Sequence, residues 1–401
     1  MGAGAISGRE GPAGPARKPL ETRPLVTAII PAFNAEPWIE ATLRSVAAQT
    51  WRVLEILIVD DGSTDRTAAI AQAFCAGEPR ARLIRKPNGG VASARNRGIA
   101  EAAGEWLAPI DADDLWHATY IEKMVEAALA APERPGFVYA WHRRLDMEGR
   151  VTGSCDALDA SGRALRRLAY RNPVGNGSAI LIDAAAARAA RGYDETLHAE
   201  RAWGGEDWLL QMELAARHPV ALVPEYLVGY RLVPGAMSSD NERMHRSWQA
   251  GMRRFTARHG AIPGPAARRD RGMRWFMLAE AKAGRREFAA MAALLARSIH
   301  ADPLRISLRL VARKLRFARR VLRTARPPGE LPAFADCPTT GPIGGDRHAC
   351  GPMERLLARL DRRRFRNLAR DESPLAQGFG RSGRRRDLKR SSESASCPSS
   401  A

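Results

Sequence analysis

Residues 106–114 read Trp106-Leu-Ala-Pro-Ile-Asp111-Ala-Asp113-Asp114, an apolar run that leads directly into three aspartates. We expect the run to form a buried strand that delivers the acidic residues at its end. Successive side chains of an extended chain alternate in direction, so Asp111 and Asp113 would point to the same side. Two carboxylates placed in this way can hold a hard divalent cation through oxygen. The alternative is a strand-to-helix turn in which an aspartate caps the following helix.

The segment around this run alternates apolar strands with amphipathic helices. In chain order we expect strands at 26–30, 54–59, 82–85 and from 106, and helices at 37–49, 63–76 and 91–103. Pro31 should stop the first strand, and Ser63 or Thr64 should cap the second helix. Unbroken apolar strands that alternate with helices predict an α/β fold, with a mostly parallel sheet covered by helices on both faces.

A polar cluster follows each of these four strands. The clusters are Phe33-Asn34, Asp60-Asp61, Asn88-Gly89-Gly90 and Asp111–Asp114. Ligands of parallel α/β sheets bind beyond the carboxyl ends of the strands, so four clusters in these positions predict one shared site. Each cluster taken alone also fits an ordinary turn or a helix cap.

The chemistry of the middle clusters suits a nucleotide. A carboxylate of Asp60-Asp61 can accept hydrogen bonds from a nucleobase imide or a ribose hydroxyl, and Gly62 permits close approach of a ligand. The cluster at 88–90 opens a helix with Arg95 and Arg97, where N–H groups and guanidinium charge favour a diphosphate. A solvated helix face is the alternative for both arginines, and the favoured one for Arg97.

A second acidic pair, Glu206-Asp207, stands at the start of a helix predicted at 208–217. Acidic residues at a helix N-terminus stabilise the helix through its dipole, which is the simplest explanation for the pair. The functional alternative is a general base that takes the proton of an attacking sugar hydroxyl. Trp203 and Trp208 flank the pair and would form either core or an aromatic wall for a sugar ring.

Composition and periodicity divide the whole chain into four parts. We expect further strands at 136–141, 176–182, 220–223 and 226–230, and a helix near 163–170 within an irregular stretch at 143–172. Helices should follow at 242–259, 266–283, 285–301 and 303–325. The expected organisation is a disordered leader at 1–23, an α/β domain at 24–240, a basic helical region at 241–326 and a disordered basic tail at 327–401.

Positive charge is concentrated in the second half of the chain. The net charge is +19, yet residues 24–240 hold 23 Lys and Arg against 28 Asp and Glu, whereas residues 241–401 hold 36 against 14. The basic half favours an anionic partner. In 303–325, leucine and valine recur at helical spacing among eight Arg and Lys, so this helix would either pack on the preceding domain or lie on anionic lipid. Nucleic acid is not expected as a partner, because no nucleic-acid-binding motif accompanies the charge.

Cysteine usage and hydropathy bear on the cellular compartment. Five scattered cysteines show neither disulfide nor zinc spacing, which favours a reducing cytoplasm. No run approaches the roughly 18–20 apolar residues of a membrane span. We therefore expect a cytoplasmic protein, with any contact to the inner face of the plasma membrane being peripheral and made through residues 303–326.

Five motifs occur in order along residues 24–240. They are Val26-Thr-Ala-Ile-Ile-Pro-Ala-Phe-Asn34, Ile58-Val-Asp-Asp-Gly-Ser-Thr-Asp65, Gly89-Gly-Val-Ala-Ser-Ala-Arg-Asn-Arg-Gly98, Asp111-Ala-Asp-Asp114 and Gly205-Glu-Asp-Trp208. Together they resemble the family 2 inverting glycosyltransferases of GT-A fold. The resemblance implies transfer of a sugar, with inversion, from a nucleotide-diphosphate-sugar (a UDP-sugar is expected) to a saccharide or lipid-linked acceptor. It also implies a role in bacterial surface polysaccharide, glycoconjugate or cell-wall synthesis.

The resemblance assigns the donor contacts by position. Pro31, Phe33 and Asn34 would line the nucleotide pocket, and Asp60 would contact the base. Arg95 would lie near the base or the diphosphate.

The same resemblance assigns the metal and the base. Asp111 would contact the ribose or the sugar-phosphate, and Asp113 would coordinate Mg²⁺ or Mn²⁺ on the diphosphate. Asp207 would be the catalytic base, with Glu206 beside it.

One position departs from the resemblance. Many relatives carry a late histidine after a Tyr-Arg pair, and this chain has Val233 there. Either that ligand is missing, or Arg231 and the loop at 235–239 cover the phosphates instead. The alternative from another functional class is a catalytically silent, nucleotide-sugar-binding scaffold of the same fold. The intact acidic residues argue against it.

Overall fold

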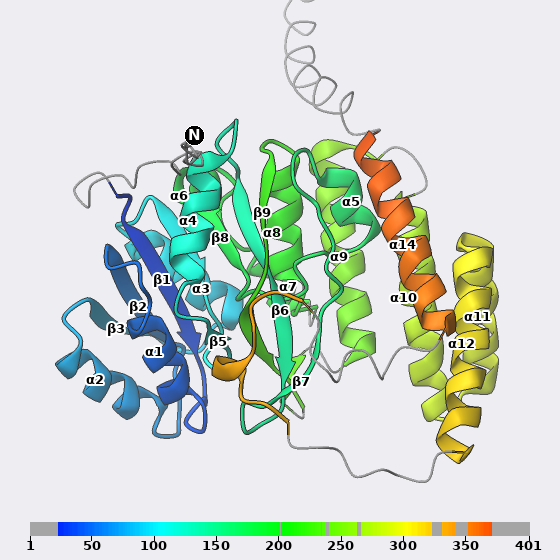
Figure 1. The fold of residues 1–401 in the computed structure, drawn as a ribbon, viewed down its shortest axis with the longest axis horizontal. Coiled ribbons are helices and arrows are strands. Elements are labelled where there is room, and N and C mark those ends of the chain that lie inside the picture. The colour runs from blue at the N-terminus through cyan, green and yellow to red at the C-terminus, as the bar shows by residue number, and fades with distance from the viewer. Residues whose placement is uncertain are drawn as a thin grey trace, which may run out of the picture.

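A computed structural model gives the fold (Figure 1) and describes residues 23–200, 202–233, 235–237, 240–262, 266–322, 331–341 and 352–370. The strands are β1 Val26–Ala32, β2 Leu54–Asp60, β3 Ala81–Arg85, β4 Trp106–Pro109, β5 Leu115–Trp116, β6 Phe137–Leu145, β7 Val151–Ser154, β8 Ile180–Asp183 and β9 Val220–Arg231. The helices of the α/β part are α1 Ile39–Ala47, α2 Thr67–Gly77, α3 Val91–Glu101, α4 Tyr120–Ala130, α5 Leu165–Tyr170, α6 Ala184–Ala189, α7 Thr196–Ala199 and α8 Glu206–Ala215. They are followed by α9 Asn241–His259, α10 Ala266–Gly284, α11 Phe288–Ala301, α12 Pro303–Leu322, the short 3₁₀ helix η3 Phe334–Asp336 and α14 Pro352–Arg370.

In the described residues nine strands form one sheet, in the order β3-β2-β1-β4-β8-β6-β9-β5, with β7 paired to β6. The half from β3 to β4 is parallel throughout. The other half is mixed, because β8 runs antiparallel to both β4 and β6 while β9 runs parallel to β6. The predicted α/β class is confirmed, and its parallel half is the one that carries the unbroken apolar strands.

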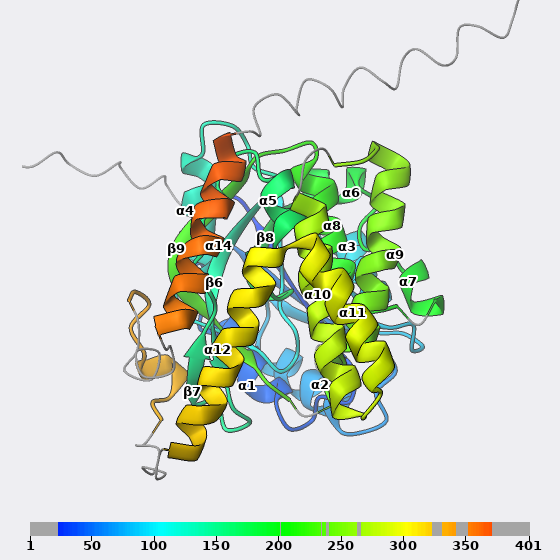
Figure 2. The same ribbon diagram turned by 90° about the vertical axis from the view of Figure 1, so that its right-hand side faces the viewer.

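Helices cover both faces of this sheet, as predicted. Figures 1 and 2 show α4 on one face and α3, α6 and α8 on the other. All seven residues of β1 are buried, as are six of the seven in β2. Strands buried on both faces need apolar side chains at every position, which explains their continuous Val, Ile and Leu composition.

Two local expectations in the first half are wrong. Pro31 does not stop the first strand, since β1 continues to Ala32, whose carbonyl accepts a hydrogen bond from Asp61 N at 2.8 Å. The second helix begins at Thr67, and its first N–H groups are not capped by Ser63 or Thr64. Asp65 Oδ1 instead accepts the hydrogen bond from Thr67 N at 2.9 Å.

The middle of the chain is more regular than predicted. Strand β6 continues to Leu145 and turns back into β7, within the stretch expected to be irregular. The two strands expected at 220–223 and 226–230 are one strand, β9, whose pairing with β6 shifts register where Pro224 and Glu225 are left unpaired. A proline cannot donate to the ladder, and a bulge accommodates it without ending the strand.

The four helices predicted for the basic region are present as α9 to α12. Disorder across 327–401 is a wrong prediction where the structure describes this tail. Residues 331–341 lie against β6, β7 and β9, and α14 packs against α5 and α12 (Figure 2). Leu357, Phe365 and Leu368 of α14 are buried, a helical stripe hidden in an Arg-rich composition. The leader at 1–22 and the tail from 371 lie outside the described residues.

Helix α12 turns a charged residue inward and apolar residues outward. Arg305 is 2% exposed and pairs with Asp361 at 2.9 Å, whereas Leu304 is 53% and Val311 44% exposed. The side chains from Arg313 onward in this helix are not described. Among the described residues, no helix is both long enough and apolar enough to cross a membrane.

Candidate active site

The acidic segment forms a turn at the end of β4. The strand ends at Pro109, and Asp114 N donates to Asp111 O at 3.0 Å, so the aspartates do not lie on an extended chain as predicted. The turn nevertheless keeps Asp111 and Asp113 close together. Burial and the neighbouring Asp111 carboxylate raise the pKa of Asp113 to about 6.

Asp114 anchors this turn and does not cap a helix. Its Oδ1 accepts a hydrogen bond from Arg231 N at 2.9 Å, and its Oδ2 accepts one from Ser178 Oγ at 2.5 Å. Ser178 Oγ in turn accepts a hydrogen bond from Asp111 N at 3.0 Å. Ser178 helps to hold the acidic turn, and its role was not predicted from the sequence. The turn-forming residues Asn176-Gly-Ser just before β8 were the one sequence feature that pointed to a loop there.

Arg95 is buried and lies between two carboxylates. It is 3% exposed and donates from Nη2 to Asp111 Oδ1 at 2.6 Å and from Nη1 to Glu206 Oε1 at 3.0 Å. Its guanidinium also lies 5.2 Å from the ring centroid of Tyr193. The solvated face considered for Arg95 is therefore wrong, and its direct contact with the donor stays a prediction. Arg97 has the predicted solvated position and pairs with Glu101 at 2.8 Å.

The Glu206-Asp207 pair opens α8, and its two carboxylates are in different environments. Glu206 is buried, bound to Arg95 and to Gly204 N, which donates to Oε2 at 2.7 Å. Asp207 is half-buried and accepts a hydrogen bond from Trp208 N at 2.6 Å. Burial and the adjacent Glu206 carboxylate raise the pKa of Asp207 to about 7, and Arg95 opposes that rise. Asp207 thus has the proton affinity expected of a general base near neutral pH.

Asp60 ends β2 with one oxygen unsatisfied. Oδ1 accepts a hydrogen bond from Ser63 N at 3.2 Å. Oδ2 is buried and accepts no hydrogen bond from the described residues, and its nearest cation, Arg85 Nε, is 3.5 Å away. A buried carboxylate oxygen without a donor is costly, so this atom is a candidate for a ligand contact.

Asp61 holds the loop at 88–90 and is not exposed to a ligand. Its oxygens accept hydrogen bonds from Gly89 N at 3.0 Å, from Gly90 N at 2.7 Å and from Lys86 Nζ at 2.5 Å. The two glycine N–H groups are therefore engaged, whereas a diphosphate at the first N–H groups of α3 stays a prediction. A side chain at Gly90 would also meet the His198 ring at 2.8 Å, and Gly90 has a φ of +85°.

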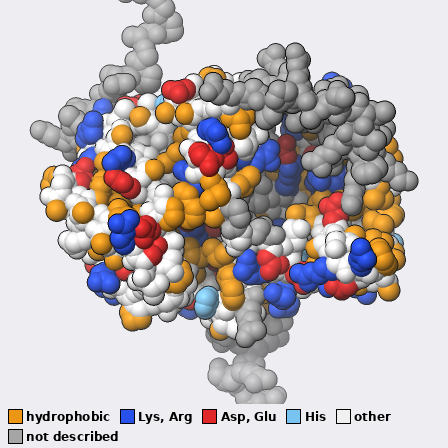
Figure 3. Space-filling model, turned by 90° about the horizontal axis from the view of Figure 1, so that it is seen from below, with side chains coloured by type: hydrophobic (Ala, Val, Ile, Leu, Met, Phe, Trp, Pro, Cys, Tyr) orange, Lys and Arg blue, Asp and Glu red, His pale blue; other side chains and the backbone are white. Residues whose placement is uncertain are grey.

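The loop after β1 presents an exposed aromatic ring at the carboxyl edge of the sheet. Phe33 is 51% exposed, and Asn34 has a φ of +49°. Asn34 Oδ1 accepts a hydrogen bond from Thr64 N at 2.9 Å, which fixes this loop to the one after β2. Figure 3 looks onto this edge, where hydrophobic side chains gather near the middle and Lys and Arg side chains lie beside them. Pro31 itself lies inside β1, paired with Val59.

The two tryptophans beside the acidic pair have different roles. Trp208 is buried core, with Nε1 donating to Leu168 O at 3.1 Å. Trp203 is half-buried and lies between other rings and charges, 5.0 Å from His198 and 5.5 Å from the Arg243 guanidinium.

Arg231 does not replace the missing histidine. It is buried, and its guanidinium donates to the backbone carbonyls of Asp113, Asp146 and Met147 at 2.8, 3.1 and 2.6 Å. It braces the acidic turn. In the loop at 235–239, residues 238 and 239 lie outside the described residues, so the prediction about that loop is not tested.

The carboxylate oxygens of Asp111 and Asp113 fit a divalent cation that a bound ligand would also coordinate. No described residue other than Asp113 itself donates a hydrogen bond to the Asp113 carboxylate. Burial raises the pKa of Asp113, and so does repulsion from Asp111, which a cation would relieve. Within the part of the chain that the structure describes, no group of three or more His, Cys, Asp or Glu could hold a metal ion by itself. Carboxylate oxygens supplemented by phosphate oxygens are how Mg²⁺ is commonly held.

Comparisons with known proteins bear on the family and the fold. Residues 27–179 match the family model "Glycosyl transferase family 2". The chain is 39% identical over 105 residues to the uncharacterized glycosyltransferase EpsJ of Bacillus subtilis, covering 26% of this chain and 30% of that protein. It is 34% identical over 128 residues to the chondroitin synthase of Pasteurella multocida, covering 32% of this chain and 13% of that protein. The chain therefore aligns with less than a third of the length of these relatives.

Two solved structures share the fold. S. aureus TarS 1-349 in complex with UDP-GlcNAc has a TM-score of 0.52 at 18% identity, covering 70% of this chain and 82% of that one. The mannosyltransferase PcManGT from Pyrobaculum calidifontis, in complex with GDP-Man and Mn²⁺, has a TM-score of 0.51 at 21% identity, covering 76% and 82%. The architecture is of the GT-A type. With the family match over 27–179, the chain carries a family 2 glycosyltransferase domain.

Proposed function

We propose that this protein is a glycosyltransferase that moves a sugar from a nucleotide-diphosphate-sugar to an acceptor hydroxyl with inversion, in the synthesis of surface polysaccharide or glycoconjugate. The observation that carries the proposal is that Asp111 and Glu206, distant in sequence, bind one buried guanidinium, that of Arg95. This shared partner supports a single site. On one side are the carboxylates proposed to contact the nucleotide-sugar and its metal, and on the other are Glu206 and the proposed base, Asp207.

The donor is proposed to be a UDP-sugar bound at the carboxyl edge of the parallel strands. The unsatisfied Oδ2 of Asp60 would accept a hydrogen bond from the imide N–H of the base, and the exposed side chain of Arg85 can swing aside. The exposed ring of Phe33 would pack against the nucleotide, with Asn34 and Pro31 shaping the loop around it. The two structural neighbours were solved with UDP-GlcNAc and with GDP-Man, which supports a nucleotide-sugar of one kind or the other.

Asp113 is the proposed ligand of a divalent cation, Mg²⁺ or Mn²⁺. When bound, the ion would neutralise charge on the diphosphate leaving group as a Lewis acid. Asp111 would contact the ribose or the sugar-phosphate through the oxygen that Arg95 leaves available. The backbone contacts of Asp114 and Arg231 hold this turn in place, so the carboxylate of Asp113 stays oriented in the ligand-free protein.

Asp207 is the proposed general base. Its carboxylate would take the proton of the acceptor hydroxyl while that oxygen attacks the anomeric carbon from the face opposite the diphosphate. The bond from the anomeric carbon to the diphosphate breaks as the new glycosidic bond forms, which inverts the configuration. Because its pKa is about 7, a substantial fraction of Asp207 is ionised at neutral pH. Glu206 is the neighbour that raises this pKa and remains bound to Arg95.

The experiment is a screen of nucleotide-sugars for release of nucleoside diphosphate by the purified full chain, first alone and then with acceptor saccharides. Asp113→Asn and Asp207→Asn test the two roles, and Arg97→Ala is the matched surface control because Arg97 lies on α3 away from the site. Binding of nucleotide-sugars without turnover under every condition would instead support the catalytically silent scaffold.

A second proposal concerns an anionic membrane surface, contacted through residues 303–326. The specific observation is that α12 exposes Leu304 and Val311 in a segment, 303–326, with nine Arg and Lys and no acidic residue. Exposed apolar side chains within a polybasic helix favour the interface of an anionic bilayer, where each basic residue contributes about 1 kcal/mol.

Liposome flotation tests the membrane proposal with vesicles that contain anionic phospholipid. Leu304→Glu together with Val311→Glu should abolish co-flotation, whereas Leu129→Glu, at an equally exposed position on α4, should not. Equal flotation of both variants would dismiss α12 as the contact.

A further inference from the structure

Arg95 joins two parts of the site that come from distant stretches of the chain. Asp111 belongs to the turn after β4, and Glu206 to the start of α8. One guanidinium binds both, at 2.6 Å and 3.0 Å, and is almost completely shielded from solvent. Two carboxylates that share one buried cation in two directed hydrogen bonds have little freedom to move relative to each other.

The Arg95 guanidinium is packed closely by its neighbours. The Tyr193 ring lies against the guanidinium, with its centroid 5.2 Å from Cζ. Gly177 is also close, since a Cβ added there would come within 2.6 Å of Nη2. Gly177 directly precedes Ser178, the residue that binds Asp114 and Asp111. Arg95 is therefore almost completely shielded, with its two terminal nitrogens bound to Asp111 and Glu206.

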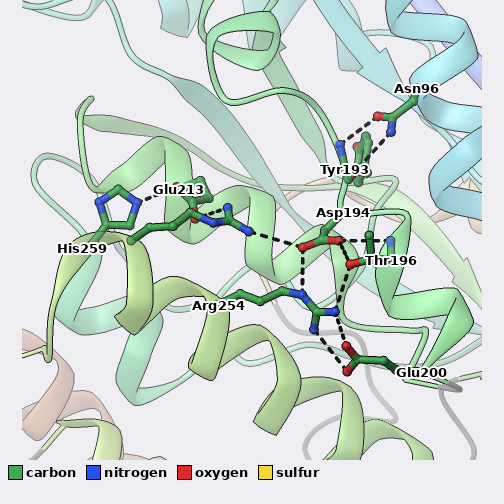
Figure 4. Close-up of polar contacts among 9 residues, drawn as sticks. Asn96, Tyr193, Asp194, Thr196, Glu200, Glu213, Arg254 and His259 are labelled. Atoms are coloured by element: carbon green, nitrogen blue, oxygen red, sulfur yellow. Dashed lines mark hydrogen bonds and ion pairs between the residues drawn. The ribbon is translucent and has the colours of Figure 1, made fainter.

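Further polar contacts hold the backbone around Tyr193 in place (Figure 4). Asn96, the neighbour of Arg95, exchanges two hydrogen bonds of 2.8 Å with the backbone of Tyr193. The next residue, Asp194, pairs with Arg254 at 3.2 Å and with Arg258 at 3.3 Å, both on α9.

Helix α9 is tied to α8 by the same group of contacts. Arg258 also binds Glu213 at 2.7 Å, and His259 approaches the other oxygen of Glu213 at 2.6 Å. Arg254 reaches Glu200 at 2.6 Å, beyond the end of α7. Tyr193, α8 and α9 all lie outside the stretch matched by the family model, so the part of the chain after residue 179 completes this site.

We propose that Arg95 is a positioning residue, which aligns the donor end of the site at Asp111 with the base end at Glu206 and Asp207, and that α9 supports it through Asp194 and Tyr193. The inference rests on the proposed function. Its consequence is geometric: loss of the bridge would leave the donor able to bind, but with the acceptor oxygen and the anomeric carbon out of line. Misplacement by about 1 Å can cost roughly 100-fold in rate.

The experiment compares Arg95→Lys, Gly177→Ala and Arg97→Ala in the full chain, by kcat and donor KM for release of nucleoside diphosphate. Lysine keeps the charge but cannot direct two hydrogen bonds to two carboxylates in one plane, and Gly177→Ala displaces the guanidinium without removing it. Arg95→Lys and Gly177→Ala should each lower kcat by roughly 10–100-fold while donor KM changes less than about threefold. Arg97→Ala should match the wild type.

The alternatives give different results. A rise in donor KM of about tenfold or more at unchanged kcat would mean that Arg95 contacts the donor, and this would overturn the positioning role. Unchanged kcat and KM in Arg95→Lys, with an active wild type, would overturn the inference alone. Absence of turnover in the wild type with every donor would overturn the proposed function and the inference together. Thermal unfolding of each variant, at a midpoint near that of the wild type, establishes that the comparison is made between folded proteins.

Discussion

Asp207→Asn removes the proposed base while retaining the size of the side chain and an oxygen that can accept from Trp208 N. The neighbouring Glu206 and Arg95 keep their ion pair, so the fold of the site should survive. The reaction should nevertheless lose the proton acceptor for the attacking hydroxyl. Since general-base catalysis contributes roughly 10²–10⁴ in rate, kcat should fall by that factor, which corresponds to about 3–5 kcal/mol in activation free energy.

The pH dependence follows from the pKa of Asp207, which burial and the Glu206 carboxylate raise to about 7. The base acts in its ionised form, so kcat of the wild type should be high above pH 7 and fall about tenfold per unit as the pH drops below it. Glu206→Gln removes the like charge and should lower the pKa of Asp207, which moves the acid limb to lower pH. Asp207→Asn should have no such limb.

The assay is the pH profile of kcat from about pH 5 to 9, at saturating donor and metal, with the same buffer series for all three proteins. Arg97→Ala serves as the control for nonspecific effects of substitution. A wild-type profile that is flat through pH 7, or an Asp207→Asn variant with wild-type kcat, would refute the assignment of the base.

Two further predictions test the donor pocket and the C-terminal helices. Asp60→Asn replaces the unsatisfied acceptor with an amide, so the affinity for UDP measured by calorimetry should fall by about tenfold; unchanged affinity would exclude Asp60 as the base contact. Asp361→Ala leaves Arg305, which is 2% exposed, without its partner and should lower the free energy of unfolding by about 3–5 kcal/mol in urea titrations. Glu101→Ala, which breaks an exposed pair with Arg97, should cost less than about 1 kcal/mol, and equal losses in the two variants would contradict the role of Asp361.

The parallel half of the fold could be predicted because its signal is local. Buried strands such as β1 and β2 need apolar residues at every position, and the motifs at their ends mark the carboxyl edge of the sheet. The mixed half was harder, because the bulge of β9 at Pro224 looks in sequence like the end of one strand and the start of another.

The candidate residues could be listed from the sequence. Which of them bind a ligand and which of them hold the surrounding backbone could not be predicted. Asp61 and Asp114 stand beside Asp60 and Asp113 in equivalent acidic pairs, yet each is used to hold backbone. Their partners lie far along the chain: Gly89 and Gly90 for Asp61, and Ser178 and Arg231 for Asp114. No local pattern carries that information.

Arg95 and α14 illustrate the same limit. A basic residue on a helix with charged neighbours is usually solvated, and only the convergence of Asp111, Glu206 and Tyr193 makes burial of Arg95 favourable. The composition of 352–370 favours disorder, whereas its buried stripe packs against α5 and α12, and its Asp361 pairs with Arg305 of α12.

Release of nucleoside diphosphate from nucleotide-sugars by the purified protein tests the central claim most directly. With Mg²⁺ or Mn²⁺ present, at least one donor should be turned over by the wild type and by Arg97→Ala. Turnover should fall to background in Asp113→Asn and when the metal is chelated. No turnover of any donor by the wild type, or undiminished turnover in Asp113→Asn, would contradict the assignment of this site as a metal-assisted glycosyltransferase centre.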